Sequence, residues 1–139
     1  LVAYPVVDLR SWGCSIGEFI AGLEETVASV LGDWGIRAQA NVRGRGVWVE
    51  DRKIASLGLH VRRSVTMHGI ALNVEPDMRH FALINPCGMA DVQMTTLAAE
   101  ARKKVPMDEV TESFVYHFAR VFRCDPKMVS LPGSASSAG

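Results

Sequence analysis

The spacing of apolar residues changes once along this 139-residue chain, and the change limits the folds that it can adopt. Between residues 16 and 31 the apolar side chains recur on one helical face, with a period of about 3.6. Ser15 and Glu18 have the spacing of a capping box, and Gly32 supplies a stop signal. We therefore expect a helix that begins after Ser15 and ends at Gly32. Its apolar face consists of Ile16, Phe19, Ile20, Leu23, Val27, Val30 and Leu31.

From Ile36 to Val74 the period is two, and Val, Ile, Thr and Leu are frequent, which is typical of strands. The segments are close in sequence, so we expect a meander of antiparallel strands. Residues 1–9 predict an earlier strand, and Pro5 favours an edge or bulged position because proline cannot donate a ladder hydrogen bond. A further short strand is expected over Phe81–Ile84. The meander strands are expected over Ala38–Val42, Gly46–Val49, Lys53–Val61 and Val65–Val74.

Helical spacing returns after residue 96. One short helix is expected over Leu97–Lys104 and a longer one from Asp108 through Phe122, with Pro106 between them. The order helix, sheet, helices predicts an α+β fold in which an antiparallel or mixed sheet packs with helices. Length favours one domain, over residues 1–131. Residues 132–139 offer nothing to bury and predict a disordered tail.

The charges argue against a nucleic-acid or anionic-membrane partner. Fifteen basic and fifteen acidic side chains cancel, so no global field attracts a polyanion. The nearest thing to a basic cluster is a set of scattered arginines, which are either solvated surface or contacts to an acidic partner. These are Arg37, Arg43, Arg45, Arg62 and Arg63.

Cysteine usage favours a reducing compartment. Cys14, Cys87 and Cys124 are an odd number at wide spacings, which argues against a disulfide framework and for a cytoplasmic location. No stretch reaches the roughly 18 apolar residues of a membrane helix. The chain begins with an apolar run in place of an initiator Met, so we expect that N-terminal sequence is missing.

Cys87 and Lys53 are the candidates for chemistry. Cys87 lies between Pro86 and Gly88, in a turn that lets its sulfur face a cleft, although a buried inert thiol is the alternative. By strand alternation, Lys53 shares a face with Ala55, Leu57, Leu59 and Val61. A lysine on an apolar face is costly, and its ammonium would favour the thiolate of a nearby cysteine. The alternative is that Lys53 extends to water from the start of its strand.

Two glycines within predicted strands indicate close approach. Gly58 and Gly69 mark either a bulge or a place where a ligand or another backbone comes near. His68 precedes Gly69 and is followed by small side chains, so it is either one wall of an acyl slot or a structural histidine.

The sequence predicts no metal site and no nucleotide site. The four histidines have no partner at metal-ligand spacing, and no Cys-x-x-Cys is present. Gly44-Arg45-Gly46 lacks the glycine pattern and following helix of a phosphate-binding loop. We therefore expect no metal and no cofactor.

Five segments of the chain follow one another in a specific order: Tyr4–Leu9, Gly46–Val49, Lys53–Gly58, His68–Val74 and Phe81–Gly88, ending near Met94–Leu97. Together they resemble the lipoyl(octanoyl) transferases, which share the fold of biotin and lipoate protein ligases. The resemblance covers about residues 1–125. In that family an Arg-Gly-Gly segment leading to His-x-Pro-Gly-Gln precedes the first strand, so the resemblance implies a catalytic domain without its N-terminal part.

The resemblance implies a two-step acyl transfer without a cofactor. A cysteine matching Cys87 would take the octanoyl group from octanoyl-acyl carrier protein as a thioester and pass it to a lysine of a lipoyl domain, in a 2-oxoacid dehydrogenase complex or the glycine cleavage H protein. The lysine matching Lys53 would lower the pKa of that thiol and act as acid and base. Substrate contacts would come from Ser56, Leu57 and Gly58, and from His68, Gly69, Ile70 and Ala71, with main-chain groups holding the acyl carbonyl.

Two other functions remain open at this point. A truncated module could bind acyl carrier protein or lipoyl domains without turnover. A cysteine hydrolase with the same Cys-Lys pair could release the acyl group to water.

Overall fold

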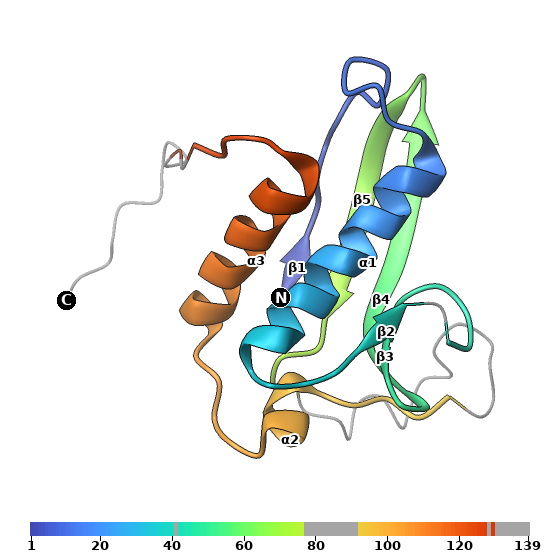
Figure 1. Ribbon diagram of the computed structural model, residues 1–139. Helices are drawn as coiled ribbons and strands as arrows, with labels where there is room; N and C mark the ends of the chain where they lie inside the picture. Colours follow the sequence, from blue (N-terminus) through green and yellow to red (C-terminus); the bar gives the residue numbers. More distant parts are fainter. Residues whose placement is uncertain (41, 77–91, 128, 130–139) are drawn as a thin grey trace.

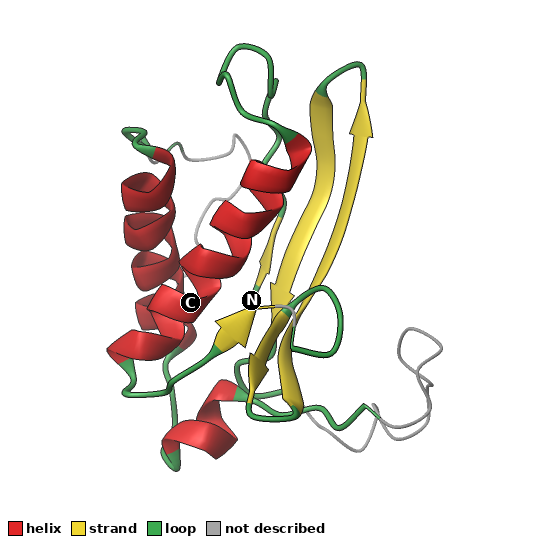
Figure 2. Cartoon of the chain, turned by 45° about the vertical axis from the view of Figure 1, so that its right-hand side comes forward, coloured by secondary structure: helices red, strands yellow, loops and turns green. Residues whose placement is uncertain are grey.

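Two helices and an antiparallel sheet form the two layers of the molecule. The computed structural model describes residues 1–40, 42–76, 92–127 and 129. Helix α1 (Ile16–Asp33) and helix α3 (Met107–Phe122) pack against each other and lie on one face of the sheet (Figure 1). The turned view in Figure 2 shows the helices and the sheet as separate layers. The predicted α+β class is confirmed.

The described sheet has five strands in the order β1-β5-β4-β3-β2, and every neighbouring pair is antiparallel. Four of them follow one another in sequence as neighbours, which confirms the predicted meander. The longest pair is β4 with β5, and it forms the centre of the sheet. The strands are β1 (Val2–Ala3), β2 (Gln39–Ala40), β3 (Val47–Val49), β4 (Arg52–Arg62) and β5 (Val65–Leu72).

Helix α1 begins as its cap predicts. The Ser15 side chain accepts a hydrogen bond from the Glu18 N–H at 3.2 Å, and the Glu18 carboxylate accepts one from the Ser15 N–H at 2.8 Å. The predicted end at Gly32 is wrong, because the helix continues to Asp33. The left-handed turn comes at Gly35, with φ of 75°, so Gly35 supplies the flexibility that was assigned to Gly32.

The first and last parts of the sheet are shorter than predicted. Only Val2 and Ala3 form a strand within residues 1–9, and Asp8 adds an isolated bridge to Val65. The segment lies at the sheet edge, which is one of the two positions that Pro5 predicts. Strand β5 ends at Leu72, two residues before the predicted Val74. The Asn73 N–H still donates to the Ile54 carbonyl of β4, but the carbonyls of Asn73 and Val74 accept hydrogen bonds from Leu97 and Ala98 at the start of the next helix. The predicted strand Phe81–Ile84 and the predicted tail 132–139 lie outside the described residues.

The C-terminal helices are confirmed with changed bounds. Helix α2 (Leu97–Ala101) is capped by Thr96 and ends three residues before the predicted Lys104. Arg102 takes a left-handed conformation, with φ of 54°, which stops the helix. Helix α3 begins at Met107, directly after Pro106.

The hydrophobic core lies between the sheet and the two long helices. Strands β3, β4 and β5 contribute Val47, Val49, Ala55, Ile70 and Leu72, all buried. None of the helices in residues 1–40, 42–76 and 92–127 combines the length and apolar composition that crossing a bilayer requires.

Two glycines of α1 should respond to alanine with opposite signs. A Cβ at Gly22 would lie 2.6 Å from Cζ of Phe122, whose ring is held by Phe19, Phe118 and Trp12. Gly22→Ala should therefore lower the free energy of unfolding by about 1–2 kcal/mol. A Cβ at Gly32 would meet no atom within 4 Å in the part of the chain that the structure describes, so Gly32→Ala should raise the free energy of unfolding by about 0.4–1 kcal/mol. Urea unfolding measures both free energies of unfolding. An equal change in the two variants would contradict the close approach of α1 and α3 at Gly22.

Candidate active site around Lys53

The main chain of Lys53 joins strand β4 to a segment that returns from later in the sequence. Its N–H donates a hydrogen bond to the Gln93 carbonyl at 2.8 Å, and its carbonyl accepts one from the Thr95 N–H at 2.9 Å. Met94 and Lys53 form a parallel bridge. Residues 93–95 therefore continue the sheet beside Lys53, where β5 has already ended.

A β-bulge decides which way Lys53 points. Val47 lies opposite Ala55, whereas the next residue, Trp48, lies opposite Lys53, so Ile54 is an extra residue in β4. Val47 belongs to the core beneath the helices, and Trp48 alternates with it, so Trp48 and Lys53 lie on the opposite face. The prediction that Lys53 shares a face with Ala55, Leu57, Leu59 and Val61 is therefore wrong, because simple alternation does not hold across a bulge.

The bulge brings Lys53 onto the face that Ser56 and Gly58 occupy. Ala55 is in the core, so Ser56 and Gly58, which alternate with it, point away from the helices. Strict alternation had placed Lys53 on the face opposite to Ser56 and Gly58, whereas the structure places all three on the same face of the sheet.

The Lys53 side chain is buried, at 5% exposed. Its Nζ lies 5.6 Å from the centroid of the Trp48 ring, within the range of a cation–π interaction. In the described part of the chain, no carboxylate forms a salt bridge with it. The alternative that Lys53 extends to water is excluded by this burial. A buried ammonium without a carboxylate partner is expensive, and such groups are concentrated at functional sites.

The two predicted substrate-contact segments are cross-strand partners. Ser56 pairs with Ala71, Leu57 with Ile70, and Gly58 with Gly69. Leu57 packs against the core, and Ile70 is part of it at 2% exposed. Any contact of these two residues with a substrate would therefore have to use their main-chain atoms.

The two strand glycines have different surroundings. A Cβ at Gly69 would overlap the Ala3 carbonyl oxygen and lie 2.8 Å from Cδ of Pro5. Of the two explanations left open for Gly69, the structure thus supports the approach of another backbone. Gly58 is exposed, and a Cβ there would meet nothing within 4 Å in the described structure. Among the described residues, the space beside Gly58 is therefore open.

His68 has an unusual backbone for a strand residue. Its φ is 65°, in the left-handed region that costs a non-glycine residue roughly 1–2 kcal/mol. The side chain is exposed, and its ring meets the Tyr4 ring edge-on at 6.5 Å between centroids. Strained residues of this kind cluster at functional sites, and a substrate contact of His68 stays a prediction.

An ion-pair network fixes the start of β4 against α2. Arg52 donates to both carboxylate oxygens of Glu100, at 3.0 and 3.2 Å, and to Glu50 at 2.8 Å. The Thr95 hydroxyl donates to Glu100 at 2.6 Å. The hydrogen bond from Arg52 is the main cause that holds the pKa of the Glu100 carboxyl below its usual value. The network thereby holds the segment that pairs with Lys53.

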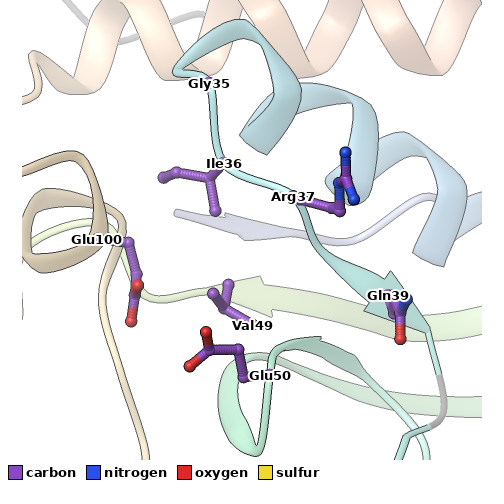
Figure 3. Close-up of a pocket in the computed structure, with 7 residues that line it drawn as sticks. All are labelled: Gly35, Ile36, Arg37, Gln39, Val49, Glu50 and Glu100. Carbon is purple, nitrogen blue, oxygen red and sulfur yellow. The ribbon is translucent and has the colours of Figure 1, made fainter.

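The cavity drawn in Figure 3 lies beside this network and does not include the predicted site. It has a volume of about 540 Å³. Figure 3 shows the carboxylates of Glu50 and Glu100 facing one side of it, whereas the Arg37 guanidinium points toward α1. Its lining residues are Gly35, Ile36, Arg37, Gln39, Val49, Glu50 and Glu100, none of which was a predicted site residue.

A second cavity, of about 650 Å³, lies next to the predicted site. Its wall includes Ala71 and continues through Asn73, whose N–H donates to the carbonyl of the bulge residue Ile54 at 3.0 Å. Leu1, Val2, Leu72, Val74 and Val105 give it much of its apolar lining.

Cys87 lies outside the described residues, so its place relative to Lys53 stays a prediction. Cys14 and Cys124 are half-buried free thiols, and burial raises the pKa of the Cys14 thiol. The described part of the chain holds no group of three or more His, Cys, Asp or Glu side chains placed to share a metal ion.

Sequence reasoning missed two residues near Lys53. Trp48 contacts the ammonium, and the tight turn between β3 and β4 could have identified it as the cross-strand partner. Glu24 is a buried acid within the apolar face of α1, since it follows Ile20 by four positions and precedes Val27 by three. An acidic residue on an apolar helical face was the signal for it.

Curated bacterial octanoyltransferases are similar to most of this chain. The octanoyltransferase of Solibacter usitatus (strain Ellin6076) is 44% identical over 138 residues, which are 99% of this chain and 60% of the relative. The octanoyltransferase of Syntrophobacter fumaroxidans (strain DSM 10017 / MPOB) is 42% identical over 131 residues, or 94% of this chain and 58% of the relative. The chain thus spans about three fifths of the length of these two relatives.

Solved ligases share the fold. A lipoate-protein ligase A bound with ATP superposes with a TM-score of 0.71 at 13% identity, covering 95% of this chain and 54% of that protein. The biotin protein ligase from Aquifex aeolicus gives a TM-score of 0.67 at 15% identity, covering 86% of this chain and 50% of the ligase. At these identities the likeness establishes the fold, and it confirms the predicted ligase-like architecture.

Residues 1–119 match the family model of the lipoyl protein ligase A/B catalytic domain. The match covers most of the chain, agrees with the curated relatives, and includes every described strand and the predicted site residues. The chain therefore belongs to the lipoyl protein ligase A/B catalytic-domain family.

Proposed function

We propose that this chain carries the catalytic residues of an octanoyltransferase, with Cys87 as the nucleophile and Lys53 as its acid and base. The octanoyl group would come from octanoyl-acyl carrier protein and end on a lysine of a lipoyl domain, in the cytoplasm. The observation that carries the proposal is the buried ammonium of Lys53, on the same sheet face as Ser56 and Gly58.

Chain continuity supports the pairing of Cys87 with Lys53. Cys87 precedes Gln93 by six positions in the sequence, and the Gln93 carbonyl accepts a hydrogen bond from the Lys53 N–H. Gln93, which follows Cys87 closely in sequence, is therefore hydrogen-bonded to the main chain of Lys53.

The reaction divides into two acyl transfers. In the first, the Cys87 thiolate attacks the carbonyl of the donor thioester, and the carrier thiol leaves with a proton supplied by Lys53. In the second, the amine of the acceptor lysine attacks the Cys87 thioester and loses a proton to Lys53. The amide forms, and the Cys87 thiolate leaves and is regenerated.

Main-chain geometry supports Leu57 as the donor to the acyl carbonyl. Leu72 and Leu1 exchange both of their main-chain hydrogen bonds, so Leu72 points toward β1 and Ala71 toward β4. The main-chain groups of Ser56 and Gly58 therefore form hydrogen bonds with β5. The main-chain groups of Leu57 point away from β5, toward the side of β4 on which β3 lies. Within the described residues β3 pairs with β4 only as far as Ala55, which leaves the Leu57 N–H available to an oxyanion.

The apolar cavity beside Ala71 suits an alkyl chain. Its lining of aliphatic side chains is the kind of surface that gains free energy by removing an acyl tail from water, about 25 cal/mol per Å² of buried area.

The test is the mass of the protein after incubation with octanoyl-acyl carrier protein. One octanoyl adduct should appear, map to the peptide that contains Cys87, and disappear in Cys87→Ser. Cys14→Ser and Cys124→Ser are matched controls that should keep the adduct. An adduct on either of those cysteines would refute the assignment. The measurement should be made on this chain and on a chain of the relatives' full length.

A binding-only module is the second candidate, because the chain spans about three fifths of its relatives. It predicts that this chain binds octanoyl-acyl carrier protein or a lipoyl domain at equilibrium without gaining the octanoyl mass, whereas a chain of the relatives' full length gains it. Free octanoate formed at the turnover rate without an acceptor would instead indicate a hydrolase.

A further inference from the structure

Glu24 is a buried carboxylate to which the acyl-transfer steps assign no role. Its side chain is 2% exposed and points from α1 to the loop before β3. There its Oε1 accepts a hydrogen bond from the Gly46 N–H at 3.0 Å. Burying a carboxylate costs several kcal/mol unless hydrogen bonds compensate, so this contact fixes both partners.

Gly46 leaves the space through which the Lys53 side chain passes. Its φ is 125°, a conformation that residues with a Cβ rarely adopt. A Cβ at this position would overlap the Ala55 carbonyl oxygen and lie 2.7 Å from Cε of Lys53. The stem of Lys53 therefore rests against the main chain of Gly46.

The same loop holds the ring that faces the ammonium. The Trp48 indole N–H donates to the Gly44 carbonyl at 3.0 Å, and Nζ of Lys53 lies 5.6 Å from the Trp48 ring centroid. The stem of Lys53 thus lies against Gly46 and its charged end faces Trp48, and both residues belong to the short segment Gly44–Trp48. A shift of this segment would move both contacts together.

We infer that Glu24 is a positioning residue for Lys53, acting through its hydrogen bond to Gly46. The carboxylate anchors Gly46 to α1, and Gly46 with Trp48 fixes the lysine on the face of Ser56 and Gly58. The inference deepens the proposed function, since the importance of the position of Lys53 rests on its acid–base role.

The experiment compares substitutions at two neighbouring glutamates of α1. Glu24→Met keeps the side-chain length and removes the acceptor without leaving a buried charge, whereas Glu24→Gln keeps an oxygen that can accept from Gly46. Glu25→Met is the matched control, because Glu25 is exposed on the same helix turn. The readout is the rate at which acetic anhydride labels Lys53, measured by peptide mass spectrometry with Lys103 as an exposed internal reference.

A hydrogen bond to a charged group is worth about 1.5–3 kcal/mol, so Glu24→Met should raise the labelling rate of Lys53 roughly tenfold or more. The reference lysine should not change, and Glu24→Gln and Glu25→Met should stay close to the unsubstituted protein. In the octanoyl assay, Glu24→Met should lower kcat more than it raises KM, because it moves the acid–base group. A folded Glu24→Met protein with unchanged Lys53 labelling would overturn the inference.

Two further outcomes separate the inference from the proposed function. If Lys53→Met keeps octanoyl transfer, the acid–base role fails, yet Lys53 labelling in Glu24→Met still decides whether Glu24 positions it. If Glu24→Met does not fold, hydrogen exchange of the Gly46 amide in the unsubstituted protein is decisive. Protection supports the anchor, and exchange at the rate of an open peptide contradicts it.

Discussion

Replacement of Lys53 by methionine is expected to lower the rate of octanoyl transfer roughly 10²- to 10⁴-fold, the usual contribution of a general acid–base residue. Methionine fills a similar volume, and it replaces a buried ammonium that has no carboxylate partner among the described residues, so the fold should persist. The measurement is single-turnover transfer to a lipoyl domain, together with circular dichroism to confirm folding.

The matched control is Lys103→Met, which changes the same residue type at an exposed position. It should transfer octanoate at the unsubstituted rate. If Lys53→Met were folded and within threefold of the control, Lys53 would have no acid–base role, and the proposed mechanism would be wrong.

Replacement of Gly46 by alanine is expected to lower the free energy of unfolding by about 3 kcal/mol or more. The left-handed φ of 125° and the overlap with the Ala55 carbonyl each cost on the order of 1–3 kcal/mol. The overlap involves main chain in β4, which cannot rotate away as a side chain could. Urea unfolding followed by tryptophan fluorescence measures the loss, since Trp48 lies two residues away.

Gly58→Ala is the comparison for stability, because its Cβ would meet no atom of the described residues within 4 Å and its φ is not in the left-handed region. Its free energy of unfolding should stay within about 1 kcal/mol of the unsubstituted value. Its octanoyl transfer should nevertheless fall if acyl substrate passes beside Gly58. Equal losses of stability at Gly46 and Gly58 would show that the replacement of glycine in general, and not the contact with Lys53 and Ala55, is responsible.

The strongest local signals in the sequence were sufficient for the elements. The pair Ser15 and Glu18 predicted the start of α1, and the period of two with its turns predicted the antiparallel meander, because both depend on residues close in sequence. The predicted end of α1 was wrong because two glycines, Gly32 and Gly35, can each end a helix. Only Gly35 takes the left-handed conformation, and the sequence does not show which of the two does so.

Only part of the candidate site could be predicted from such local signals in the sequence. Lys53 was identified from its odd place in an apolar strand, and its burial confirms that it does not extend to water. The predicted sheet face of the Lys53 side chain was wrong, because strict alternation of side chains along a strand assumes that no residue is inserted. The bulge at Ile54 depends on how β3 and β4 pack over the core. Glu24 could be noticed on its helix, but not its partner Gly46, because the two are 22 positions apart.

The sequence by itself thus determined the elements and the residue types available for chemistry, because caps, turns and hydrophobic periods act over a few residues. Only the tertiary structure decided that Lys53 faces the side of Ser56 and Gly58, with Trp48 over its ammonium and residues 93–95 beside its main chain. The physical reason is that register between strands, and therefore the face that each side chain takes, is set by packing across long sequence separations.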